Sequence, residues 1–70
     1  MGKHAITNCI RRLRADHADM TQQELADQVG VTRQTINAIE LEKYSPSLEV
    51  AFKIAAVFKI PLEKVFQYRD

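Results

Sequence analysis

The chain has 70 residues, enough for one small domain but near the lower limit at which a single core is stable alone. Hydrophobic residues form 46% of the chain, which excludes a disordered polypeptide, and its apolar runs are too short for a membrane-spanning helix. The net charge of +1 does not by itself indicate nucleic acid as a partner.

Charge is nevertheless distributed unevenly along the chain. Residues 15–32 carry four acidic residues and no basic one, whereas the first 14 residues carry four basic residues and no acidic one: Lys3, Arg11, Arg12 and Arg14. A protein of small net charge binds DNA when its basic residues gather on the contacting face. We therefore expect moderate non-specific affinity, with base recognition contributing much of the discrimination.

The beginning of the chain, MGKHAITN, contains no apolar signal-peptide region, so we do not expect secretion. Cys9 is the only cysteine, which excludes an internal disulfide and is typical of the reducing cytoplasm. Residues 5–7 and 66–68 both contain β-favouring side chains. These two segments either pair as a very short ribbon, packed on the helices or on a partner chain, or stay unpaired.

The first predicted helix follows Asn8, which caps it, and ends near His17. Ile10 and Leu13 lie three residues apart and are expected to face inward. Cys9 is interpreted most simply as a further small core residue.

A connector at residues 18–20 leads to the second predicted helix. Thr21 caps this helix, and Glu24 three residues later completes a T-x-x-E capping box. Gly30 ends the helix, because glycine adopts the required left-handed conformation without a Cβ penalty. The inward stripe of this helix consists of Leu25, Ala26 and Val29.

The third predicted helix is capped by Thr32 and runs to about Leu41. Ile36 and Ile39 lie on its inward face. Its outward positions carry Arg33, Gln34, Thr35, Asn37 and Ala38. Two short helices joined by a tight turn, here at 22–41, are the layout of a helix-turn-helix, whose second helix enters the DNA major groove.

The outward side chains are suited to base recognition. Arg33 can donate two hydrogen bonds to guanine O6 and N7, and Gln34 can pair with adenine N6 and N7. Thr35 and Ala38 are short enough for close approach or for contact with a thymine methyl group, and Asn37 can reach a base edge or a phosphate. The alternative is that they are ordinary residues of a solvated helix.

Phosphate contacts are expected at helix N-termini, where free N–H groups and the helix dipole attract anions. Gln22 opens the second helix and is therefore an expected phosphate ligand. Thr32 is expected to act mainly as a cap and secondarily as a phosphate contact. Lys43 and Tyr44 follow the third helix and are expected to face the flanking DNA backbone; the alternative for Tyr44 is packing against the next helix.

Arg14 and Glu40 are interpreted as a structural pair rather than as a functional site. Each lies beside the inward face of its helix. We expect a partly buried, bidentate ion pair that fixes the relative orientation of the first and third helices.

The sequence Tyr44-Ser45-Pro46 interrupts the helical pattern. Ser47 caps a fourth helix over 48–59, and Pro61 suits the first turn of a fifth helix over 61–66. The expected inward residues of these two helices are Val50, Ile54, Val57, Phe58, Leu62, Val65 and Phe66. The sequence thus predicts five helices, and no segment alternates apolar and polar residues over the length of a strand. This pattern indicates an all-α fold.

Metal, cofactor and catalytic chemistry are not expected. The spacing of His4, Cys9 and His17 matches no zinc pattern. The chain contains neither a glycine-rich phosphate loop nor a G-x-S-x-G motif. We also see no separate ligand-binding domain, so no small-molecule ligand is expected.

Three motifs carry a family resemblance: T-Q-x-E-L-A, then V-T-R-Q-T-I-N-x-I-E, then Y-x-P-S-L. With these motifs, residues 8–66 resemble the Cro/C1-type (Xre-like) helix-turn-helix regulators, especially their minimal single-domain dimeric repressors. The resemblance implies one five-helix, lambda-repressor-like domain over 1–70 and supports the terminal ribbon. It also implies base contacts at Arg33, Gln34 and their neighbours, with phosphate contacts at Gln22 and Lys43.

One departure concerns the connector before T-Q. Family members usually have a glycine there, whereas this chain has His17-Ala18-Asp19-Met20 and one residue more. The end of the first helix is therefore expected to differ, and Asp16 and Asp19 argue against a phosphate clamp in this loop.

The resemblance further implies a homodimer that binds a palindromic double-stranded DNA operator and pairs through its C-terminal helix, Leu62 to Phe66. A single recognition helix covers too few base pairs for operator-level specificity, which favours a dimer independently. The expected interface residues are Leu62, Val65, Phe66 and Tyr68. The alternative for Phe66 is that it closes the monomer core.

We therefore expect a cytoplasmic transcriptional regulator that acts as a repressor without a cofactor, activation being the alternative. Two other classes stay open: the antitoxin of a toxin–antitoxin pair, and a protein-interaction module that has lost DNA binding. Such antitoxins usually carry an additional arm, and this chain ends four residues after the last helix. A module without DNA binding is expected to have acidic or bulky residues on the third helix.

Overall fold

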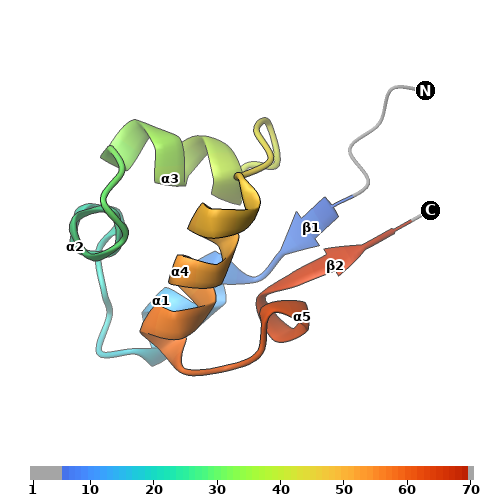
Figure 1. Cartoon of the computed structure of the whole chain (residues 1–70). Coiled ribbons are helices and arrows are strands. Elements are labelled where there is room, and N and C mark those ends of the chain that lie inside the picture. Colours follow the sequence, from blue (N-terminus) through green and yellow to red (C-terminus); the bar gives the residue numbers. More distant parts are fainter. Residues whose placement is uncertain (1–5, 70) are drawn as a thin grey trace.

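The computed structural model describes residues 6–69. Within that range the chain forms five helices and one two-stranded antiparallel sheet, arranged as in Figure 1. The elements in chain order are β1 (Ile6–Asn8), α1 (Ile10–Asp16), α2 (Gln22–Val29), α3 (Arg33–Glu40), α4 (Leu48–Phe58), α5 (Leu62–Val65) and β2 (Phe66–Tyr68). The predicted five-helix fold with a terminal ribbon is confirmed.

Aliphatic side chains from all five helices meet in one core. Burying a side chain of this size contributes about 1.5–3 kcal/mol, so these residues supply much of the driving force for folding. The largest fully buried side chains are Ile10, Leu25, Ile36, Ile39, Ile54 and Val65.

Side-chain caps begin three of the helices, as predicted. Thr21 Oγ1 accepts a hydrogen bond from the Glu24 backbone N–H at 3.0 Å, and Glu24 Oε1 accepts one from the Thr21 N–H at 2.8 Å. Thr32 caps α3 and Ser47 caps α4, each accepting from the N–H three residues later. Local sequence therefore determines where these helices begin.

The predicted cap of α1 is wrong by one residue. The N-cap position is Cys9, whose side chain makes no capping bond, and Asn8 lies in β1. The Asn8 side chain still accepts a hydrogen bond from the Ile10 N–H at 3.1 Å and donates one to the Ile39 carbonyl at 2.9 Å. Asn8 therefore links the ribbon to the start of α1 and to the last turn of α3.

Left-handed residues end three of the helices. Gly30 follows α2 with φ 88°, as predicted, while Glu42 and Lys59 follow α3 and α4 with φ 61° and 59°. In all three cases the next N–H donates to a carbonyl five residues earlier, which is the Schellman pattern. A Cβ at Gly30 would meet nothing within 4 Å, so glycine is favoured there by conformation alone.

The connector between α1 and α2 also turns through left-handed residues. Ala18 and Asp19 have φ values of 55° and 53°. The turn therefore forms without glycine, at a conformational cost of about 1–2 kcal/mol for each such residue. The Met20 N–H donates to the Arg14 carbonyl at 2.9 Å and closes the turn.

Several helix ends differ from the predicted limits. α1 ends at Asp16 rather than at His17, and α3 ends at Glu40. α4 ends one residue early because Lys59 is left-handed. α5 is shorter than 61–66, because Phe66 is extended (φ −120°, ψ 140°) and begins β2.

The two ends of the described chain pair as a ribbon. Ile6 pairs with Tyr68, Thr7 with Gln67 and Asn8 with Phe66. The paired segment is thus 6–8 rather than 5–7, and Ala5 lies outside the described residues. Figure 1 shows the ribbon at the opposite end of the molecule from α2.

A nearly buried ion pair joins α1 to α3, as predicted. Arg14 Nε donates to Glu40 Oε2 at 2.6 Å and Nη2 donates to Glu40 Oε1 at 3.0 Å. The third nitrogen, Nη1, donates to the Met20 carbonyl at 2.8 Å. The two side chains are only 15% and 6% exposed, so each depends on the other for its compensating charge.

Hydrogen bonding to Glu40 raises the pKa of the Arg14 guanidinium above its ordinary value, outweighing the lowering caused by burial; charge attraction adds to the increase. A pKa raised by folding contributes stability below the unfolded-state value. That stability is lost only when the pH rises through the raised pKa. The contribution is therefore constant across neutral pH.

Replacement of Glu40 by alanine should lower the free energy of unfolding by about 3–5 kcal/mol, because the Arg14 charge would stay largely buried without a partner. Urea denaturation at fixed protein concentration measures this loss. The double variant Arg14→Met, Glu40→Leu should recover most of it, since a well-packed apolar pair replaces a buried ion pair at little cost. Equal stability of Glu40→Ala and the unmodified protein would contradict the proposed role of the pair.

Candidate nucleic-acid interface

The helix-turn-helix consists of α2, the turn at Gly30 and α3. α2 packs against both α3 and α4, so it connects the second helix of the motif to the rest of the core. In Figure 1, α3 lies along the upper side of the molecule and α2 is seen end-on beside it. α3 buries Ile36 and Ile39 and leaves its opposite side to solvent.

The solvent side of α3 carries the five predicted recognition residues, which we call the recognition face: Arg33, Gln34, Thr35, Asn37 and Ala38. Arg33, Gln34 and Asn37 are exposed, whereas Thr35 and Ala38 are half-buried. Long polar side chains therefore surround two short ones. Such a surface can approach another molecule closely and still present hydrogen-bonding groups to it.

Thr32 and Thr35 hold each other in place at the start of α3. The Thr35 N–H donates to Thr32 Oγ1 at 3.1 Å, and the two hydroxyl groups share a hydrogen bond at 2.9 Å. This arrangement agrees with the expected capping role of Thr32. It also restricts the rotation of the Thr35 side chain.

Gln22 opens α2, but its amide is turned toward α3. Its Nε2 donates to Asn37 Oδ1 at 3.1 Å and to Glu40 Oε1 at 3.0 Å. Both amide hydrogens are thus used within the protein. The expected contact between this side chain and a phosphate would require these bonds to break.

Gln22 and Asn37 also line a polar hollow of about 290 Å³ between α1, α2 and α3. We name it the polar hollow; its lining residues are Arg11, Arg14, Gln22, Asn37, Glu40 and Leu41. Arg11 is exposed and contributes a positive charge next to Asn37. Sequence reasoning did not assign Arg11 to the site, although its spacing of three from Arg14 places both on one side of α1.

Lys43 and Tyr44 follow the end of α3 and are both exposed. The Lys43 N–H donates to the Ala38 carbonyl at 2.9 Å, which holds the chain beside the last turn of the helix. Tyr44 is 52% exposed, so about half of its surface is accessible to a partner. Both residues are available beside the recognition face.

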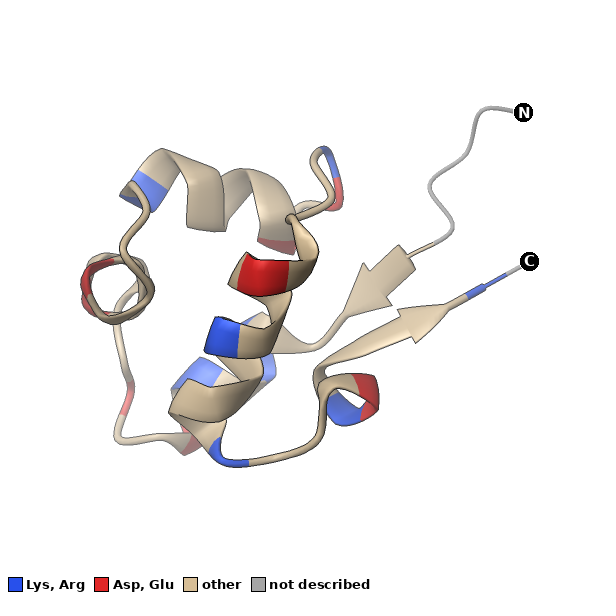
Figure 2. Ribbon diagram, viewed as in Figure 1, with Lys and Arg blue, Asp and Glu red and all other residues tan. Residues whose placement is uncertain are grey.

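Charge differs between the elements of this surface, as Figure 2 shows. Basic positions lie on α1 and at the start of α3, whereas α2 carries acidic residues. Glu24 belongs to the capping box, and Asp27 accepts a hydrogen bond from Gln23 at 2.8 Å. A polyanion is therefore favoured at α1 and at the start of α3 rather than across the outer side of α2.

The expected dimer residues lie at the other end of the molecule. Leu62 and Phe66 are half-buried and Tyr68 is exposed. Val65 is fully buried within the single chain, so the prediction that it lines an interface is wrong. Its side chain faces the core because α5 brings Val65 beneath the ribbon, where its carbonyl accepts from the Cys9 N–H at 3.1 Å.

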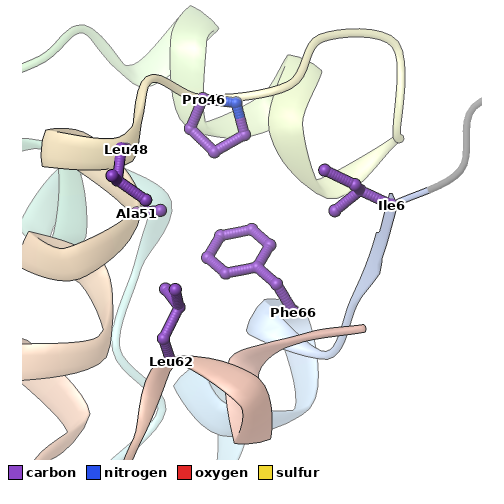
Figure 3. Close-up of a pocket in the computed structure, with 6 residues that line it drawn as sticks. All are labelled: Ile6, Pro46, Leu48, Ala51, Leu62 and Phe66. Carbon is purple, nitrogen blue, oxygen red and sulfur yellow. The ribbon is translucent and has the colours of Figure 1, made fainter. Parts of the chain in front are cut away.

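Leu62 and Phe66 line an apolar hollow of about 290 Å³ (Figure 3). We name it the apolar hollow; its lining residues are Ile6, Pro46, Leu48, Ala51, Leu62 and Phe66. Leu48, which lines this hollow, is 67% exposed, and Phe52, four residues later on α4, is 54% exposed. Sequence reasoning missed both residues, because α4 is apolar over most of its circumference.

Cys9 and His17, the two candidate soft ligands that the structure describes, each contact other groups. Among residues 6–69, no three His, Cys, Asp or Glu side chains form a potential metal site. Cys9 Sγ donates to the Lys64 carbonyl, and the His17 ring packs edge-on against Phe58 at 5.6 Å. His4, like Lys3, lies outside the described residues.

The described helices include none long and apolar enough to span a membrane.

Comparisons with known proteins agree with this geometry. Residues 10–65 match the family described as helix-turn-helix. An uncharacterised HTH-type transcriptional regulator of Methanocaldococcus jannaschii is 51% identical over 63 residues, which cover 90% of this chain and 94% of that protein. One from Archaeoglobus fulgidus is 51% identical over 61 residues, covering 87% of this chain and 86% of the relative.

A solved structure is also similar. The crystal structure of a Bacteroides fragilis protein, described as a candidate DNA-binding protein, superimposes with a TM-score of 0.77. The sequence identity is 26%, and the match covers 89% of this chain and 98% of that chain.

Proposed function

The chain belongs to the helix-turn-helix family of DNA-binding transcriptional regulators, and we propose that it is a repressor that binds a palindromic operator as a homodimer. The proposed site of action is the cytoplasm, where a repressor reaches the DNA. Repression would follow from occupancy of an operator that overlaps a promoter. No cofactor or small-molecule ligand enters this mechanism.

The observation that carries the proposal is the recognition face on a rigidly held α3. Its buried side packs in the core, and Glu40 at its last turn is bound by both Arg14 and Gln22. A recognition helix must enter the groove with little loss of freedom, because ordering it on binding would reduce affinity. Arg33 and Gln34 in its first turn have the donors that guanine and adenine edges accept.

Phosphate contacts are proposed on both sides of the recognition face. Arg11 lines the polar hollow with Glu40 and Leu41, and Lys43 and Tyr44 follow this same C-terminal end of α3. Contacts of this kind fix the register of a protein on the duplex without reading its sequence. Thr32 and the first turn of α2 at Gln22 add backbone N–H groups at two helix N-termini.

The dimer surface is proposed around the apolar hollow. Leu48 lines the hollow with Leu62 and Phe66, and exposed Phe52 lies one turn further along α4, so a second copy would remove this apolar surface from water. A two-fold interface uses the same patch on both copies. Two recognition helices about 34 Å apart would then read half-sites one helical turn apart.

Replacement of Arg33 by alanine should abolish base preference at one position in each half-site, because the bidentate donor to guanine is lost. Selection of bound sequences from a random duplex pool at fixed salt measures this, and the unmodified protein should yield a two-fold symmetric motif. Lys53→Ala, which removes an exposed cation of α4, is the control and should retain the motif. Absence of any motif from the unmodified protein would contradict the proposed function and favour a toxin or another protein as the partner.

Replacement of Arg11 by alanine should weaken binding about equally for all DNA sequences. It should also reduce the slope of log K against log salt by about one, since one phosphate contact is lost. The matched control is Arg12→Ala, which removes the same charge from a position about 100° around α1. An equal effect of the two substitutions would show that Arg11 acts through net charge and not through a contact.

Replacement of Leu48 by glutamate should shift the protein from dimer to monomer, because a charge would enter the apolar interface. Sedimentation equilibrium at several protein concentrations measures the change. Leu41→Glu is the control, since Leu41 is a leucine of similar exposure (56%) outside the apolar patch. A dimer that survives Leu48→Glu, or dissociates equally with Leu41→Glu, would place the interface elsewhere.

A further inference from the structure

We propose that Gln22 is a positioning residue that orients the amide of Asn37 and thereby selects the class of base that Asn37 reads. This inference rests on the proposed function, because it concerns recognition of DNA by α3. It assigns Gln22 a role different from the expected phosphate contact. The observation that supports this role is the pair of hydrogen bonds that Gln22 Nε2 donates to α3.

The Gln22 amide is itself held at a defined place. Glu40 Oε1 accepts from both Gln22 Nε2 and Arg14 Nη2, each at 3.0 Å. The Glu40 carboxylate is fixed in turn by the second bond from Arg14 at 2.6 Å. The path from Arg14 to Asn37 is therefore continuous, and both Nε2 hydrogens of Gln22 have acceptors in α3.

This arrangement fixes the orientation of the Asn37 amide. Its Oδ1 accepts from Gln22 at 3.1 Å, and Asn37 is exposed at the surface of α3. With Oδ1 bound on the protein side, the two hydrogens of Nδ2 are the groups that Asn37 offers to a partner. Asn37 thus approaches the major groove as a donor.

The four bases respond differently to such a donor. Guanine and thymine present acceptors and no donor at their hydrogen-bonding groups in the major groove. Adenine recognition by asparagine uses Oδ1 and Nδ2 together, so adenine N6 would have to reach the second lone pair of an Oδ1 whose direction Gln22 already fixes. The structure therefore predicts guanine or thymine, rather than adenine, at the base that Asn37 contacts.

The test is selection of bound duplexes at fixed salt with four proteins: unmodified, Asn37→Ala, Gln22→Ala and Gln23→Ala. Asn37→Ala identifies the position that Asn37 reads, because preference there is lost. Gln22→Ala should shift that same position toward adenine by about tenfold and leave the position read by Arg33 unchanged. Gln23→Ala is the matched control, since Gln23 is the next residue of α2 and donates to Asp27 instead of α3.

A second variant tests whether a changed motif results from a loss of structure rather than from the loss of the donor. Gln22→Met retains the length of the side chain but has no donor, so it should change the motif as Gln22→Ala does. Thermal unfolding of both variants shows whether they remain folded at the temperature of the selection.

The outcomes separate the two proposals. An unmodified protein without a motif would refute the proposed function and, with it, this inference. A motif that Gln22→Ala leaves unchanged would refute this inference alone. Equal weakening for all sequences in Gln22→Ala would also refute it, because a phosphate ligand produces that result. Retention of every preference in Asn37→Ala would show that Asn37 reads no base.

Discussion

The Glu40 carboxylate is the constraint on which the DNA-facing side of the molecule depends. It receives hydrogen bonds from Arg14 on α1 and from Gln22 on α2, while it belongs to the last turn of α3. Three helices therefore converge on one side chain that is almost inaccessible to water. Hydrophobic packing alone permits small rotations of helices about their axes, whereas directional bonds to a carboxylate do not. The ion pair thus fixes the orientation of the recognition face and also stabilises the fold.

The starts of α2, α3 and α4 and the end of α2 could be predicted because they follow from local chemistry. Thr21, Thr32 and Ser47 cap their helices, and Gly30 ends α2, each through interactions within a few residues of sequence. The left-handed residues Glu42 and Lys59 had no such signal. Neither is glycine, and their conformation is imposed by the path of the chain after α3 and α4.

The candidate site was predictable in its position but not in its internal contacts. Periodicity placed Asn37 on the outer side of α3, but it contains no information on the direction of an amide. The orientation of Gln22 depends on where α1 brings Arg14, which is a tertiary feature. In α4, periodicity placed Ile54 in the core, where it lies, but the nearly continuous apolar sequence contained no sign that Leu48 and Phe52 stay exposed.

The pairing of β1 with β2 has a consequence for synthesis of the protein. β1 leaves the ribosome long before β2, so it has no strand to pair with while α1 to α4 are being made. The contacts of the helix-turn-helix do not need the ribbon, because its partners α1 and α4 precede β2. The apolar hollow cannot form, since Phe66 enters it with β2 and Ile6 with β1. The DNA-facing side therefore depends on contacts among elements that precede β2, whereas the surface through which two copies would associate needs both ends of the described chain.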